Sequence, residues 1–188
     1  MGVAALHHHD GPFTEAEYLA LGEDSGQRRE LIDGSLMMSP WPTRVHQRIS
    51  LRLAMILDQA VPEGFEAQIG VNVRLGRDRI LIPDNVVLTQ VGGTELVVEA
   101  AGVAVFIEIL SPSTKRIDRV LKTNLAAEAR IPHFWLVDPD GPVVTVYELV
   151  GDAYKQSATA TGEQLISLTM PFPVDFRPSE LLAAHRQK

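Results

Sequence analysis

Apolar residues recur along the chain at two spacings, one typical of helices and one typical of strands. Residues 43–60 place apolar side chains three and four positions apart, which predicts an amphipathic helix. Residues 65–75 alternate between apolar and polar, which predicts a half-buried strand. Residues 103–110, VAVFIEIL, are almost wholly apolar and typical of a strand buried on both faces. The predicted apolar faces are Val45, Ile49, Leu53, Ile56, Leu57 and Ala60 on the helix, and Ile69, Val71, Val73 and Leu75 on the alternating strand.

Capping and turn signals set the limits of the other elements. Thr14-Glu15-Ala16-Glu17 is a capping box, which predicts a short helix that ends near Gly22. Asp33-Gly34 predicts a hairpin turn within residues 28–38. The remaining expected elements are a strand over 79–88, a helix over 114–130, strands over 133–138 and 143–149, a short strand near Tyr154 and a helix that starts near Pro178.

This order of elements predicts one α/β (α+β) domain, in which helices flank a central mixed β-sheet. The chain has 188 residues, which is the size of a single domain. We expect residues 13–188 to fold as that domain and residues 1–12 to form a flexible N-terminal tail. His7, His8 and His9 lie in this tail, where they would bind metal ions only adventitiously.

Composition and charge exclude several classes of protein. The absence of cysteine excludes disulfides, cysteine-ligated zinc, iron–sulfur clusters and cysteine nucleophiles. No run of 18 apolar residues and no secretory signal is present, so we expect a cytoplasmic protein that does not enter a membrane. The net charge of -7 argues against a generally basic nucleic-acid-binding surface but is compatible with a local basic cleft. Motifs for P-loop nucleotide hydrolysis, dinucleotide binding, serine hydrolysis and zinc proteolysis are absent.

Two acidic residues stand where strands are expected to end. Glu108 lies within the apolar strand, where a lone carboxylate is costly unless it is paired, binds a cation or is partly solvated. Asp84 follows Pro83, and taken alone it would be interpreted as a turn aspartate. Taken together, carboxylates at the ends of adjacent strands predict an oxygen-ligand site for Mg²⁺ or Mn²⁺. Such a metal polarises phosphoryl oxygens.

A basic segment follows the strand that carries Glu108. Lys122 stands four residues after Asp118, so it fits either a role in the site or an ordinary i,i+4 ion pair on a helix surface. The same segment contains the densest basic run of the chain, formed by Lys115, Arg116 and Arg119. These three residues would either contact phosphates or form a solvated helix face.

An ordered set of short motifs resembles a known family. The motifs are Glu30-Leu31-Ile32-Asp33-Gly34, Met38-Ser39-Pro40 with His46, Pro83-Asp84, Phe106-Ile107-Glu108-Ile109-Leu110-Ser111-Pro112-Ser113-Thr114, Asp118-Arg119 with Lys122, and Ile131-Pro132-His133-Phe134-Trp135-Leu136-Val137-Asp138-Pro139. Together they resemble the predicted bacterial restriction endonucleases of the PD-(D/E)XK nuclease superfamily. This branch was long catalogued as a domain of unknown function and is abundant in cyanobacteria. The resemblance covers roughly residues 28–155.

The resemblance implies a restriction-endonuclease-like core and a metal site formed by Asp84 and Glu108, with Mg²⁺ (or Mn²⁺) as the cofactor. In the superfamily a lysine usually stands two residues after the second acid, where this chain has Leu110. In this branch the lysine has moved to the following helix, which points to Lys122. The branch usually carries an aromatic residue three positions later, and Leu125 replaces it here.

Glu30 and His46 also match recurrent positions of the branch, as accessory residues to which the resemblance assigns no role. From the residues alone, Glu30 is either a further acid of the site or a charge at a strand edge. His46 lies on the predicted helix 43–60, where a lone histidine is more often structural than catalytic.

Three functions are compatible with these observations. The first is a metal-dependent endonuclease that hydrolyses DNA phosphodiester bonds, with Asp84, Glu108 and Lys122 as catalytic residues. Lys122 would position the attacking water or stabilise charge on the phosphate. The second is a non-cleaving binding or regulatory module, suggested by the displaced lysine, Leu125 and the acidic net charge. The third is a hydrolase of a small phosphate ester. A homodimer would suit an enzyme that cuts both DNA strands.

Overall fold

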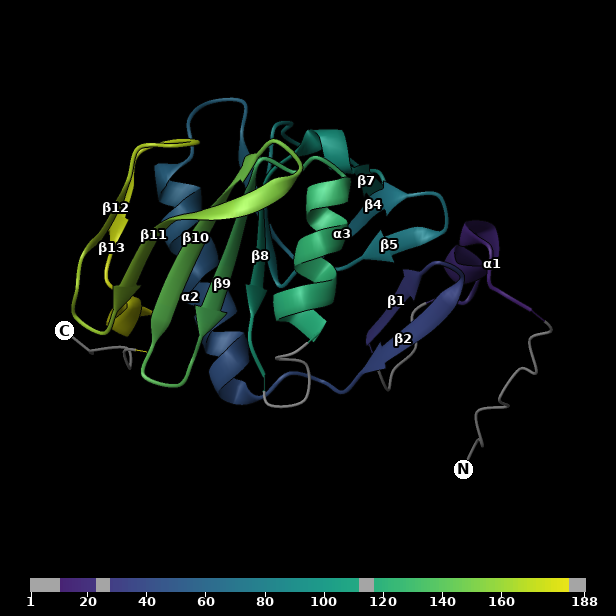
Figure 1. Cartoon of the computed structure of the whole chain (residues 1–188), viewed down its shortest axis with the longest axis horizontal. Coiled ribbons are helices and arrows are strands. Elements are labelled where there is room, and N and C mark those ends of the chain that lie inside the picture. Colours follow the sequence, from purple (N-terminus) through teal and green to yellow (C-terminus); the bar gives the residue numbers. More distant parts are fainter. Residues whose placement is uncertain (1–10, 23–27, 112–116, 183–188) are drawn as a thin grey trace.

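Two β-sheets organise the fold (Figure 1). The computed structural model describes residues 11–22, 28–111 and 117–182, so the predicted tail up to residue 10, together with Lys115 and Arg116, lies outside the described residues. The helical elements are α1 (Glu15–Ala20), α2 (Arg44–Ala60), α3 (Thr123–Glu128), the 3₁₀ turns η1 (Ala100–Gly102) and η3 (Pro178–Leu181), and the π-helical turn η2 (Ile117–Lys122). The strands are β1 (Arg28–Ile32), β2 (Ser35–Ser39), β3 (Glu66–Ile69), β4 (Asn72–Gly76), β5 (Arg79–Leu81), β6 (Asn85–Leu88), β7 (Val97–Glu99), β8 (Val103–Ile109), β9 (His133–Asp138), β10 (Val143–Val150), β11 (Ala153–Thr161), β12 (Ile166–Leu168) and β13 (Val174–Phe176).

The larger sheet has the strand order β11-β10-β9-β8-β6-β3. Strands β8 and β9 run parallel, and the other neighbours in this sheet are antiparallel. The second sheet has the order β2-β1-β5-β4-β7, and β12 pairs with β13 in a separate hairpin. This mixed sheet with flanking helices confirms the predicted α/β (α+β) class.

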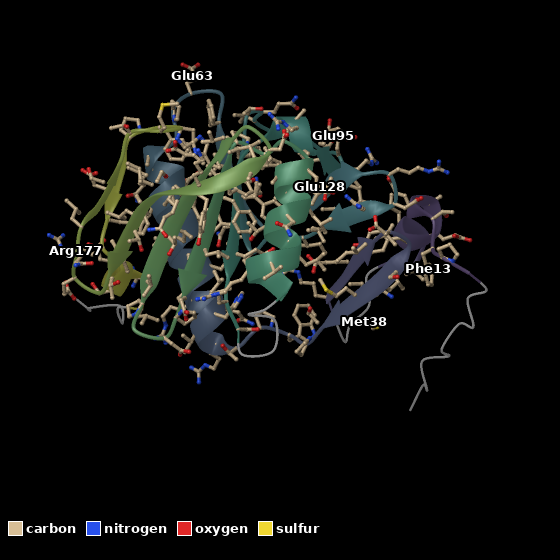
Figure 2. The ribbon with its side chains drawn as sticks, viewed as in Figure 1. Phe13, Met38, Glu63, Glu95, Glu128 and Arg177 are labelled. Atoms are coloured by element: carbon tan, nitrogen blue, oxygen red, sulfur yellow. The ribbon has the colours of Figure 1, made fainter. Side chains whose placement is uncertain are left out.

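Helices cover the two faces of the larger sheet (Figure 1). On one face, α2 and the β12–β13 hairpin enclose a core that includes Leu53, Ile107 and Trp135. On the other face, α3 packs Leu125 into a second core that includes Phe106 and is shared with β4 and β5. Charged side chains such as those of Glu63, Glu95 and Arg177 are exposed at the outside of this body (Figure 2). No helix within the described ranges has the length and apolar character needed to cross a membrane.

Strand β8 lies inside the larger sheet, and all seven of its residues are buried. Its residues alternate between the two cores, with Val105 and Ile107 in the α2 core and Phe106 in the α3 core. Because side chains alternate along a strand, Glu108 is directed to the same face as Phe106, the face covered by α3. The predicted doubly buried strand is confirmed, and it brings a carboxylate into the interior.

Capping and turn residues set the limits of three elements, and two of them, the Thr14 capping box and the Asp33-Gly34 turn, were predicted and are confirmed. Thr14 and Glu17 form both bonds of the predicted capping box at α1. Thr43 caps α2 by accepting a hydrogen bond from the His46 N–H. The Asp33-Gly34 turn joins β1 to β2. Gly34 is required there, because its φ is +78° and an added Cβ would lie 2.5 Å from the Cβ of Pro12.

Two predicted strands are each divided into two strands that belong to different sheets. The single strand over 65–75 was a wrong prediction, because Gly70 adopts φ +65° and separates β3 from β4. The single strand over 79–88 was also wrong, because Pro83 lies between β5 and β6 and cannot donate to a ladder. Ile69, expected on a buried face, is 49% exposed as a result.

The helices also differ in part from the prediction. The described part of the 114–130 helix consists of the π-helical turn η2 followed by only six α-helical residues in α3. The element near Pro178 is a short 3₁₀ turn. Val45 is 45% exposed, and His46 and Ser50 are buried in its place on α2. The short strands β7, β12 and β13 were not predicted, because three residues carry too little periodicity to be recognised.

Candidate active site

Asp84 and Glu108 are brought together by the pairing of β6 with β8. The antiparallel register aligns Asn85 with Ile107, so the next pair of opposite residues along the two strands is Asp84 and Glu108. Both residues are buried, with 6% and 2% of their surface exposed. The backbone N–H of Ile109 donates to Asp84 Oδ2 over 2.8 Å, which fixes the carboxylate at this edge. The predicted acid pair therefore lies on one wall of one site.

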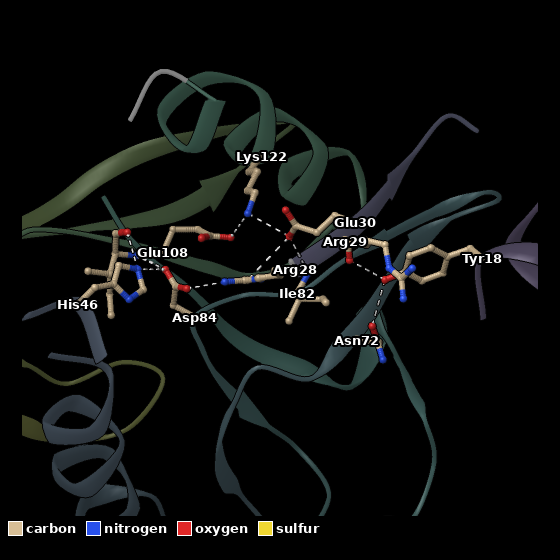
Figure 3. A network of polar contacts seen from close by, with 11 residues as sticks. Tyr18, Arg28, Arg29, Glu30, His46, Asn72, Ile82, Asp84, Glu108 and Lys122 are labelled. Atoms are coloured by element: carbon tan, nitrogen blue, oxygen red, sulfur yellow. Dashed lines mark hydrogen bonds and ion pairs between the residues drawn. The ribbon is translucent and has the colours of Figure 1, made fainter. Parts of the chain in front are cut away.

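Lys122 joins this pair from the π-helical turn η2 (Figure 3). Its ammonium nitrogen lies 3.0 Å from Glu108 Oε1 and 3.0 Å from Glu30 Oε1. Only 4% of Lys122 is exposed, so it does not belong to a solvated helix face. Lysine is rarely buried without a partner, and here two carboxylates share it.

Glu30 comes from β1, which belongs to the other sheet. It is 1% exposed, and its Oε1 also accepts a hydrogen bond of 2.8 Å from the Ile82 N–H. Pairing of β1 with β5 aligns Leu31 with Ile80 and carries Glu30 to the acid pair. The structure buries Glu30 in the lining of the same cavity as Asp84 and Glu108, so it is not a charge at a solvated strand edge.

His46 holds the opposite side of Asp84. Its Nε2 lies 3.1 Å from Asp84 Oδ2 and 3.1 Å from the carbonyl oxygen of Ile109. One turn further along α2, the Ser50 hydroxyl donates to the backbone carbonyl of Asp84 over 3.3 Å. These contacts explain why the buried face of α2 includes two polar residues where the apolar stripe alone would be expected.

Arg28 is a member of the site that the sequence reasoning missed. Its Nη1 donates to Asp84 Oδ1 over 2.7 Å, and its Nη2 lies 3.8 Å from Glu30 Oε1 (Figure 3). Arg28 stands two residues before Glu30 on β1, so the two side chains share one face of the strand. A basic residue at this spacing from a candidate acid was the signal that could have identified it.

Charges of opposite sign alternate in the cluster. Burial opposes ionisation of Asp84, but the hydrogen bond from His46, the charge of Arg28 and the Ile109 N–H together hold the pKa of that carboxyl well below its usual range. Burial by itself would lower the pKa of Arg28, and the charges of Glu30, Asp84 and Glu108 raise it above its usual value. Buried ions require such pairing to offset their loss of hydration.

The cluster lines a cavity of about 300 Å³. Its lining also includes residues 39–43, which lead from the last residue of β2 to α2, and Trp41 among them is 63% exposed. Arg119, predicted to contact phosphate, lies elsewhere: it pairs with Asp138 over 3.0 Å and lines a second cavity of about 330 Å³. Lys115 and Arg116, the other predicted phosphate ligands, fall outside the described residues.

The oxygen donors of Asp84 and Glu108 fit a hard divalent cation. In the part of the chain that the structure describes, no three His, Cys, Asp or Glu side chains form a group that could hold a metal by themselves. Mg²⁺ is usually held by one or two carboxylates, with water and substrate phosphate completing its shell. The donor set therefore fits Mg²⁺ or Mn²⁺ and does not fit a structural zinc ion.

Comparisons with known proteins give the chain a structural relative and a family. The chain has the fold of a solved protein titled a putative nuclease belonging to DUF820 from Anabaena variabilis, with a TM-score of 0.72 and 22% identity over 91% of this chain and 98% of that one. No curated protein matches the chain. The profile of the Uma2 family, described as putative restriction endonuclease, matches residues 15–184. The chain therefore belongs to the Uma2 family.

Proposed function

We propose that the protein is a metal-dependent endonuclease that hydrolyses phosphodiester bonds of DNA. The observation that carries the proposal is the convergence of Asp84, Glu108 and Lys122, from three separate segments of the chain, on the lining of one cavity. Membership of the Uma2 family and the fold shared with a protein titled a putative nuclease support the same reaction class.

In this proposal Asp84 and Glu108 hold Mg²⁺ or Mn²⁺. The chemistry that such an ion supplies is Lewis acidity, which polarises a phosphoryl oxygen and makes the attacking water more acidic. Asp84 is suited to the role because the low pKa of its carboxyl keeps it ionised at neutral pH. His46 and the Ile109 N–H orient that carboxylate, so both act as positioning groups.

Lys122 provides a fixed positive charge beside Glu108. Its ammonium nitrogen lies 3.0 Å from a carboxylate oxygen of Glu30 and 3.0 Å from one of Glu108, so Glu30 would hold it in place while Glu108 binds the metal. An ammonium group at this point would stabilise negative charge that develops on the phosphate, or orient the attacking water. Glu30 is thus a positioning residue for the lysine.

The non-cleaving alternative loses two of its arguments. The displaced lysine still meets Glu108, and Leu125 is 4% exposed within the α3 core, where it fills a packing position. The acidic net charge of -7 remains, and it also motivates the third function, hydrolysis of a small phosphate ester. These functions differ in the substrate that is cleaved, so a panel of substrates separates them.

The test is a cleavage assay with supercoiled plasmid, linear duplex, single-stranded DNA and a chromogenic small phosphodiester, each with Mg²⁺ and with a chelator. We expect Mg²⁺-dependent cleavage of at least one DNA substrate, with much slower turnover of the small ester. Turnover of the small ester alone would favour the third function. Binding of DNA without cleavage of any substrate would favour the non-cleaving module.

A further inference from the structure

Of the three guanidinium nitrogen atoms of Arg28, one donates a hydrogen bond to a described residue. Nη1 donates to Asp84 Oδ1 over 2.7 Å. Nε and Nη2 are buried, yet neither has a hydrogen-bond acceptor among the described residues. The separation of 3.8 Å between Nη2 and Glu30 Oε1 permits electrostatic attraction but is too long for a hydrogen bond. Within the described part of the chain, Arg28 thus keeps N–H groups that have no acceptor.

Unused donors on a buried guanidinium are costly and call for an explanation. The guanidinium is a planar fork that matches the oxygens of a phosphate two at a time. Arg28 also belongs to the lining of the cavity, together with Asp84, Glu108 and Lys122. The unused part of the fork therefore lies in the site where a phosphodiester would have to bind.

The bond to Asp84 places Arg28 in competition with a metal ion. Asp84 Oδ1 accepts from Arg28, and Oδ2 already accepts from the Ile109 N–H and contacts His46. A divalent cation that binds this carboxylate meets the positive charge of the guanidinium at the same oxygen. Arg28 is the contact of Asp84 that a cation would replace most directly, because the Ile109 N–H is part of the backbone.

We propose that Arg28 is a displaceable internal cation, which neutralises Asp84 in the metal-free protein and binds a substrate phosphate through its unused donors when a divalent ion occupies Asp84 and Glu108. This inference rests on the proposed function, from which it takes the metal and the phosphate. In this inference the partner of Arg28 is Asp84 in the metal-free site and a substrate phosphate in the metal-loaded site. Displacement of a guanidinium from Asp84 then accompanies loading of the metal.

The test is Mg²⁺ titration calorimetry on the full chain, with wild type, Arg28→Gln and the control Arg29→Gln. Arg29 is the neighbouring arginine on β1, and its Nη2 donates to the Gly22 carbonyl outside the cavity. We expect Arg28→Gln to bind Mg²⁺ roughly tenfold more tightly than wild type, because one competing charge beside Asp84 is removed. Arg29→Gln should bind Mg²⁺ as wild type does.

A second titration uses a hydrolysis-resistant phosphorothioate dinucleotide in the presence of saturating Mg²⁺. Here we expect Arg28→Gln to bind about tenfold more weakly, because a charge-assisted fork is lost. Arg28→Lys keeps the charge without the fork, and it should restore wild-type Mg²⁺ affinity but not dinucleotide affinity. This variant also covers the case in which Arg28→Gln, checked by circular dichroism, does not fold.

The outcomes distinguish this inference from the proposed function. Equal Mg²⁺ affinity of wild type and a folded Arg28→Gln would overturn the role of Arg28 and leave the metal site intact. Unchanged dinucleotide affinity in both Arg28 variants would likewise overturn the role of Arg28 as a phosphate ligand. Absence of Mg²⁺ binding in wild type and in all the variants would overturn the metal site and the inference with it.

Discussion

Lys122 Nζ lies 3.0 Å from Glu108 Oε1, although the two residues are 14 positions apart and η2 carries the lysine. The position two residues after Glu108 is taken by Leu110, which is 3% exposed and packs in the α3 core with Leu125. A lysine at that position would have to bury its charge in this core. The ammonium group instead reaches the carboxylate from the helical turn, so the site is defined by geometry and not by sequence spacing.

Replacement of Lys122 by Met should destabilise the protein and abolish its activity. The side chain is buried between Glu30 and Glu108, and its loss leaves two carboxylates without their shared cation. Breaking a buried ion pair from one side costs about 3–5 kcal/mol of unfolding free energy. Urea denaturation measures this loss.

The matched control for that variant is Lys155→Met. Lys155 lies on β11 and is exposed. We expect its replacement to change the unfolding free energy by less than about 0.5 kcal/mol, as for most surface sites. Similar small effects of both substitutions would show that the buried ion pairs of Lys122 contribute nothing to stability.

Ionised Asp84 should contribute to the free energy of unfolding, and this contribution should be lost only at acid pH. Its pKa in the folded protein lies well below the ordinary value of about 3.9. Because the folded pKa is depressed, the contribution is fully present above the unfolded pKa and declines as the pH falls through the folded value. Urea unfolding from pH 6 to pH 2.5 should show this decline in wild type and a smaller one in Asp84→Asn. If the unfolding free energies of wild type and Asp84→Asn fell in parallel with pH, Asp84 would not be the source of the decline.

His133 should make stability depend on pH in a different range. Burial lowers the pKa of its imidazole. The charge of Glu148, which lies opposite His133 on β10, opposes this shift in part. The folded pKa is therefore below the unfolded value of about 6.5, so stability is fully present above pH 6.5 and falls as the pH drops below it. His133→Gln should lose less stability than wild type between about pH 6.5 and 5. An identical loss in both proteins would exclude His133 as its source.

Tyr18 should stabilise the junction between α1 and the strand that carries Arg28 and Glu30. Its hydroxyl donates to the backbone carbonyl of Arg29 over 2.9 Å, and burial raises the pKa of Tyr18 to about 12. Tyr18→Phe removes this hydrogen bond and should cost about 1 kcal/mol of unfolding free energy. The site itself is not altered, so Mg²⁺ affinity should be unchanged. A loss of Mg²⁺ affinity would show that α1 positions β1 for metal binding.

The sequence was sufficient to predict the parts of the fold that depend on local patterns. The capping box at Thr14, the Asp33-Gly34 turn and the apolar strand β8 each depend on neighbouring residues, and each is confirmed. The approach of Asp84 to Glu108 was also predictable, because the two carboxylates stand where adjacent strands were expected to end.

The remaining parts depend on contacts between distant segments. Arg28 and Glu30 reach the site only because β1 pairs with β5, and nothing in local periodicity reports that pairing. Gly70 and Pro83 each divide a continuous apolar pattern between two sheets. The pattern shows which side chains are buried but not which sheet receives them, so the second sheet was not foreseen.

Nicking of supercoiled plasmid in Mg²⁺ tests the central claim most directly, with wild type, Asp84→Asn, Glu108→Gln and Glu63→Gln. Mg²⁺ prefers carboxylate and water ligands to imidazole, so His7, His8 and His9 should not contribute. Glu63 is exposed in the loop after α2 and serves as the matched control (Figure 2). We predict that wild type and Glu63→Gln nick the plasmid and that the two site variants do not. Nicking at the wild-type rate by folded Glu108→Gln would contradict the proposed site.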